Sequence, residues 1–137
     1  MKKFGMRCAV MAVLGVAMMV FSGNKQVVAN ADDVSIKVVM EKVNKSGVCK
    51  ALGDGLKAKE PKWDELAVKS KAVVPLAAAM VKNKPPKGDE ASWKKFSEDY
   101  AKAAVDLDKA VAAKDATAAL AAHKVLANCM GCHKVHK

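Results

Sequence analysis

Apolar residues recur every three or four positions through most of the chain after residue 32. This spacing gathers them on one face of an α-helix. No run of β-branched or aromatic residues alternates with polar ones between turn signals, as a half-buried strand would require. The pattern therefore predicts four helices, over residues 33–46, 61–82, 91–113 and 116–136.

Glycine and proline mark the predicted interruptions. Gly53 and Gly55 should break the short segment after the first helix, and NKPPKGDE forms a loop before the third. Pro75 should kink or split the second helix, because it lacks a backbone N–H and its ring clashes with the preceding turn. Asp115 can cap the last helix. Amphipathic helices with short connections predict an all-α fold, an up-down-up-down four-helix bundle.

The N-terminal region has a different character from the rest of the chain. Three basic residues precede an apolar run of 14 residues at positions 8–21, and an A-x-A site ends at Ala31. This is the pattern of a secretory signal peptide, and the run is shorter than the roughly 20 residues that span a bilayer. We expect residues 1–31 to be removed. Residues 32–137 would then form one periplasmic domain without stable membrane insertion.

The strongest chemical signal lies close to the C-terminus. The sequence CMGCH places Cys129, Cys132 and His133 at positions i, i+3 and i+4, on one face of a helix. C-x-x-C-H is the signature of c-type haem attachment. The two thiols add to the vinyl groups of the porphyrin, and the adjacent imidazole reaches the iron. The motif predicts one covalent haem c, with His133 as a ligand of the iron.

Three other kinds of site remain open for the motif. Cys129, Cys132, His133 and His136 could together bind zinc, although structural zinc sites usually draw their ligands from separated segments. A disulfide of the thioredoxin type accompanies a βαβ pattern, which the chain does not show. A plain disulfide would leave His133 without a role.

The chain with this motif in its last helix resembles the class II c-type cytochromes, the cytochrome c′ group. The resemblance rests on CMGCH, on the first-helix sequence DVSIKVVMEKV, and on the basic residue Lys137 four positions after the motif histidine. NKPPKG before the third helix is also similar to small exported cytochromes. The predicted domain is shorter than usual, and many members have arginine where Lys137 stands. The resemblance implies a one-electron carrier. No catalysis is expected, since no acid–base pair or nucleophile stands outside the motif.

The resemblance also implies a second ligand of the iron. In its low-spin members, a first-helix methionine that matches Met40 binds iron opposite the histidine. In the cytochromes c′ proper that place is apolar, and the iron is five-coordinate and binds gases. The predicted topology puts Met40 and His133 at similar heights on neighbouring helices, with Trp93 and Phe96 nearby. Met80 is the reserve ligand, and a core role is the alternative for Met40.

The remaining cysteine and histidines are expected to have lesser roles. His123 precedes His133 by ten residues, about 15 Å along a helix, which is too far to share the iron. His136 is expected to face solvent. Cys49 is expected to be a buried small residue, with an intermolecular disulfide as the alternative.

Charge suggests the class of partner. The net charge is +10, and it becomes +6 when the four basic residues before position 32 are removed with the signal peptide. Lysines gathered at the haem end could steer an acidic redox protein, or could simply be a solvated surface. No nucleic-acid-reading motif is present. Many class II bundles dimerise, so a homodimer stays open. The lysines are Lys37, Lys84, Lys87, Lys94, Lys95, Lys134 and Lys137.

Overall fold

The computed structural model describes residues 34–137, and all their regular elements are helical. The predicted signal peptide lies outside the described residues. No strand occurs within 34–137, which confirms the prediction of an all-α helical fold. None of the helices there is long and apolar enough to cross a membrane. The elements are α1 (Ile36–Met40), the π-helical η1 (Glu41–Lys45), α2 (Val48–Leu56), α3 (Trp63–Lys82), α4 (Glu90–Ala112), α5 (Ala116–Leu126) and α6 (Cys129–His136).

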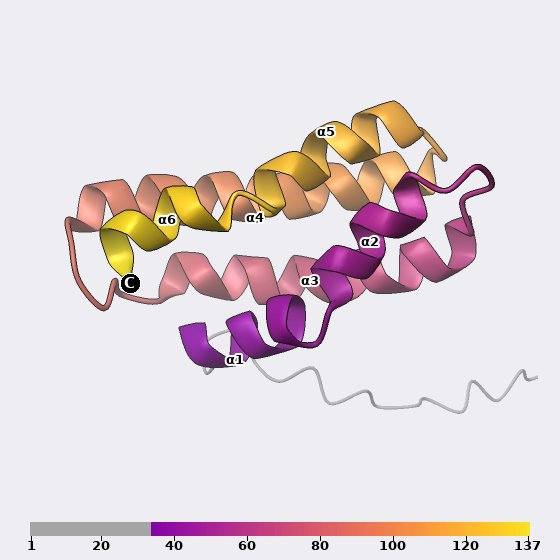
Figure 1. The fold of residues 1–137 in the computed structure, drawn as a ribbon. Coiled ribbons are helices and arrows are strands. Elements are labelled where there is room, and N and C mark those ends of the chain that lie inside the picture. The colour runs from indigo at the N-terminus through magenta and orange to yellow at the C-terminus, as the bar shows by residue number, and fades with distance from the viewer. Residues whose placement is uncertain (1–33) are drawn as a thin grey trace, which may run out of the picture.

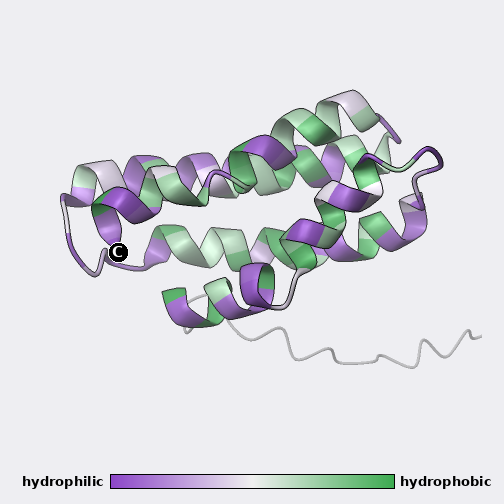
Figure 2. Cartoon of the chain, in the orientation of Figure 1, coloured by the Kyte–Doolittle hydropathy of each residue, from purple (hydrophilic) through white to green (hydrophobic). Residues whose placement is uncertain are grey.

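The long helices α3 and α4 form the centre of the bundle. They pack along each other, and α5 and α6 run one after the other along α4 (Figure 1). Both α1 and α2 pack on α3, and α2 also reaches α5. Each helix carries both apolar and polar residues along its length (Figure 2), as expected where one face is buried. The first and last described helices therefore pack on the two central helices, α1 on α3 and α6 on α4.

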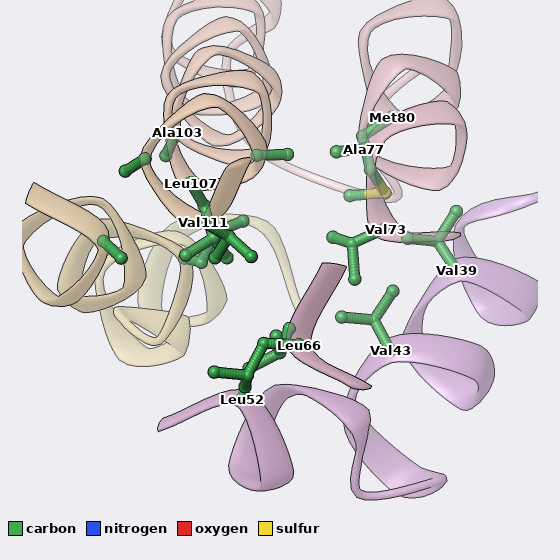
Figure 3. Close-up of a cluster of buried hydrophobic side chains, with 14 of the residues drawn as sticks. Val39, Val43, Leu52, Leu66, Val73, Ala77, Met80, Ala103, Leu107 and Val111 are labelled. Atoms are coloured by element: carbon green, nitrogen blue, oxygen red, sulfur yellow. The ribbon is translucent and has the colours of Figure 1, made fainter. Parts of the chain in front are cut away.

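The hydrophobic core lies between these helices. Figure 3 shows side chains from the N-terminal segment, α2, α3 and α4 converging on a shared interior. Val39 and Leu107 are fully buried there. Ser70 of α3 is buried beside the core, and its Oγ donates to Asp108 Oδ1 of α4 over 2.6 Å. This bond joins the two central helices.

The predicted break at Gly53 and Gly55 is wrong, and Pro75 does not split its helix. Helix α3 continues through Pro75, which is exposed together with Lys71, so the carbonyl that loses its helical donor faces water. Gly53 and Gly55 lie inside α2. A Cβ on Gly53 would lie 2.6 Å from the His123 ring, and one on Gly55 would lie 2.8 Å from Leu66. These glycines therefore permit close packing between helices instead of ending one.

One predicted helix is divided in two, and another changes from α-helical to π-helical. Asn128 separates α5 from α6, and its side-chain oxygen accepts from the Gly131 N–H over 3.3 Å. Asparagine is a strong N-cap and a weak helix former, so a new helix begins there. In the first predicted helix, the Ser46 N–H donates to the Glu41 carbonyl over 2.9 Å, which widens the turn into η1. The cap predicted at Asp115 is confirmed.

Candidate functional site

A cavity of about 790 Å³ lies between the N-terminal segment, the end of α3, the first half of α4 and α6. Its volume falls in the upper part of the 300–1,000 Å³ range typical of small-molecule sites. The lining is mainly apolar. The residues that the sequence singled out meet here, namely Met40, Met80, Trp93, Phe96, Cys129, Cys132 and His133.

The C-x-x-C-H motif forms the first turn of α6. Cys129, Cys132 and His133 are all half-buried and line the cavity, and both cysteines are free thiols. Burial raises the pKa of the Cys132 thiol, and the nearby Cys129 adds to that rise. Cys132 is therefore protonated at neutral pH. The Asn128 cap sets where α6 begins, so it determines the direction in which this turn presents its side chains.

Met40 lines the cavity from the end of α1. Its Sδ accepts a hydrogen bond from Asn44 Nδ2 over 3.3 Å. On the other side of the same amide, Asn44 Oδ1 lies 4.0 Å from Cys129 Sγ. A single side chain thus joins the methionine and the first motif cysteine. Met80 also borders the cavity, but it is only 6% exposed and belongs to the hydrophobic core.

The hydroxyl of Tyr100 is buried at the cavity and finds no hydrogen-bond partner among the described residues. Burial raises the pKa of Tyr100, and the nearby Cys49 and Cys129 add to the rise. The hydroxyl therefore stays protonated and able to donate. An unpaired buried donor is costly, about 1–3 kcal/mol, unless a bound group accepts its hydrogen.

The residues around this cavity fit haem c. Two thiols, an imidazole and a thioether are the side chains that attach and ligate haem. The apolar lining suits the macrocycle, while Tyr100 and three lining lysines suit its carboxylates. Those lysines are Lys37, Lys45 and Lys137.

His136 is buried, so the prediction that it faces solvent is wrong. It is 3% exposed. Its Nδ1 donates to the Lys87 carbonyl over 3.0 Å, and its Nε2 pairs with Ser92 Oγ over 2.9 Å. Trp93 and Phe96 contact the ring edge-to-face. The end of α6 is thereby fastened to the loop that precedes α4.

The zinc alternative lacks the ligand cluster that it requires. Both nitrogens of His136 are engaged with the α3–α4 loop and the start of α4. No group of three or more His, Cys, Asp or Glu within residues 34–137 is placed to hold a metal ion by itself. His136 therefore serves the attachment of α6 to the bundle.

His123 and Cys49 form a contact outside the cavity lining. His123 Nε2 lies 2.7 Å from the Cys49 carbonyl and 3.7 Å from Cys49 Sγ. Cys49 is a free thiol and is half-buried, which is less than the sequence predicted. Burial raises the pKa of this thiol. The pair holds α2 against α5.

The fastening of α6 can be tested with two glycines of similar conformation. Gly47 and Gly88 have φ of +80° and +84°, but a Cβ meets nothing within 4 Å at Gly47 and lies 2.7 Å from the Val135 carbonyl oxygen at Gly88. We expect Gly47→Ala to lose about 1–2 kcal/mol of unfolding free energy, the cost of the left-handed backbone. Gly88→Ala should lose clearly more in urea denaturation. Equal losses would mean that the α6–loop contact contributes nothing.

No protein-family model, curated protein or solved structure matches the chain. The function must therefore be argued from the site. Sequence reasoning missed the roles of Asn44 and Tyr100 in it. Helical spacing was the only sequence signal for these two residues. Asn44 follows Met40 by one helical turn, and Tyr100 follows Phe96 by one.

Proposed function

We propose that the protein is an exported, monohaem c-type cytochrome that carries one electron at a time. Haem is attached through Cys129 and Cys132 in an up-down-up-down bundle, and His133 and Met40 are the axial ligands of the iron. The observation that carries the proposal is the meeting of the C-x-x-C-H turn and Met40 at one large, mainly apolar cavity. Haem, when bound, supplies a one-electron couple between ferrous and ferric iron.

The side chains around the cavity have separate roles in this proposal. The cysteines would fix the position of the group, and the His133 imidazole would ligate the iron. Met40 would supply a second ligand, and methionine–histidine ligation favours the ferrous state. Trp93 and Phe96 exclude water, which limits the reorganisation that a change in charge would demand. No side chain is required to transfer protons, as suits a carrier.

A five-coordinate, gas-binding haem protein is the second candidate. The Tyr100 hydroxyl favours it, because hydrogen-bond donors in a haem pocket affect which small ligands bind. In that case Met40 is a core residue whose sulfur stays on Asn44.

Intact mass spectrometry tests the proposal. We expect protein recovered from the periplasm under denaturing conditions to have the mass of residues 32–137 plus one haem, because thioether bonds survive denaturation. The apo-mass would contradict haem attachment, and an apo-mass lowered by the hydrogens of one disulfide would favour the disulfide alternative. A mass that includes residues 1–31 would contradict the signal peptide.

The proposed partner is an acidic redox protein. Lys37, Lys45 and Lys137 line the cavity, and such charges accelerate encounter with an acidic surface. We expect the rate of electron transfer to an acidic partner to fall steeply with added salt, which screens exposed charges beyond about 8 Å at physiological ionic strength. Lys37→Glu should slow the reaction several-fold, while Lys57→Glu at the end of α2 should not. A rate indifferent to salt would contradict steering.

A further inference from the structure

Asn44 occupies a distinctive place in the cavity. It is half-buried in η1 and contacts Met40 of α1 and Cys129 of α6, two of the residues that bring sulfur to the site. Its Nδ2 is 3.3 Å from Met40 Sδ, and its Oδ1 is 4.0 Å from Cys129 Sγ. Asn44 belongs to no sequence motif, and the proposed function does not require it.

The chemistry of its neighbours determines how the amide is oriented. A thioether sulfur carries no hydrogen and can only accept, so the NH₂ group must face Met40. The free Cys129 thiol can donate to the amide oxygen. The thioether that it would form with haem has no hydrogen, and the shorter contact with Met40 then favours the same orientation. Turning the amide over would direct its oxygen at the lone pairs of Met40 Sδ.

The backbone that carries Asn44 is itself held firmly. Its neighbour Val43 is 1% exposed and packs in the core. The wide π-helical turn of η1 is closed by the bond from the Ser46 N–H to the Glu41 carbonyl. Single π-helical turns within helices are frequent at functional sites. The amide is therefore presented from a rigid support.

We propose that Asn44 is a positioning residue that orients the Met40 thioether for the iron. This inference rests on the proposed function. Sulfur has two lone pairs, and the hydrogen bond from Asn44 occupies one of them, which leaves the other for the metal. Because the bond holds the sulfur in place, it hinders an external ligand from displacing Met40. It also withdraws electron density from the sulfur, which favours ferrous iron and raises the reduction potential.

The test compares variants of Asn44 that lose or keep the amide donor. Asn44→Leu keeps the approximate size without a donor, Asn44→Asp keeps the shape with an acceptor only, and Asn44→Gln keeps the amide. Lys42→Ala is the matched control, since Lys42 lies in the same π-helical segment but is exposed and outside the cavity lining. The measurements are the affinity of the oxidised, haem-loaded protein for imidazole and the reduction potential of each variant.

We expect Asn44→Leu and Asn44→Asp to bind imidazole about 10–100-fold more tightly than the native protein, the usual scale for losing an outer partner of a metal ligand. Their potentials should fall, while Asn44→Gln and Lys42→Ala should stay near native values. Should Asn44→Leu fail to fold, the imidazole affinity of Asn44→Asp decides, because the added carboxylate charge lowers the potential by itself.

Two outcomes overturn the inference and can be told apart. If the native protein and the variants without an amide donor resist imidazole equally, Met40 ligates the iron without help from Asn44. Asn44 is then a structural residue only. Native protein whose iron already binds imidazole freely would overturn Met40 ligation and, with it, the role of Asn44.

Discussion

The Met40→Ala variant is expected to be high-spin when oxidised and to bind carbon monoxide readily when reduced. In the proposed site, the Met40 sulfur closes the axial position opposite His133, and alanine cannot reach the iron. The native protein should show the weak red absorption band that sulfur–iron charge transfer gives in methionine–histidine cytochromes. The variant should lose this band. The spectra of both proteins, with and without carbon monoxide, provide the measurement.

Met80→Ala is the control for this experiment, because Met80 is the other methionine that lines the cavity. Its side chain is 6% exposed and packs in the core, so its truncation should cost about 2–5 kcal/mol of stability. The red band should nevertheless remain. The half-buried Met40 should show the opposite behaviour, a changed spectrum with a smaller loss of stability. Native protein that is high-spin and binds carbon monoxide freely would make Met40 a core residue and favour the gas-binding alternative.

A double variant, Cys129→Ala with Cys132→Ala, is expected to lose covalent haem and part of the helical structure. A dry, closed cavity of 790 Å³ would cost about 19 kcal/mol at about 24 cal/mol per Å³. This cavity opens to solvent, so the real cost is lower, but a quarter of that value already rivals the total stability of a small domain. The walls should therefore collapse or unfold when no haem is held between them.

Denaturing mass spectrometry and far-ultraviolet circular dichroism check this expectation. Cys49→Ala is the matched control, because Cys49 is also a half-buried free thiol but lies outside the cavity lining. It should retain haem and native helicity. A double variant that lacks haem yet unfolds at the native urea concentration would show that the cavity walls support themselves.

Helix α4 shows where the sequence was sufficient. The prediction of 91–113 matches Glu90–Ala112 within one residue, because a proline- and glycine-rich loop precedes it and Asp89 caps it locally. The division at Asn128 was missed, because apolar spacing continues across it and capping competes with helix continuation only weakly. Gly53 and Gly55 were misread for a related reason. Glycine breaks an isolated helix but is favoured where another helix approaches closely, and the approaching residue is distant in sequence.

The candidate site divides in the same way. The C-x-x-C-H spacing alone predicts haem attachment. The order of the helices, together with the resemblance, predicted that Met40 lies at the same site. The Asn44 amide and the Tyr100 hydroxyl depend on how side chains turn within the assembled bundle, which spacing does not determine. His136 was expected to face solvent, yet it contacts the α3–α4 loop, which is distant in sequence.

The break at Asn128 has a consequence for the maturation of the protein. Helix α6 has only eight residues, too few to be stable alone, and Asn128 uncouples it from α5. It can therefore unfold locally at a lower free energy than the paired helices α3, α4 and α5. If the protein is exported as proposed, the arriving chain could present both cysteines on an open C-terminal arm while those three helices are already packed. Formation of the thioether bonds would then be the event that locks this arm shut, as the last step of folding.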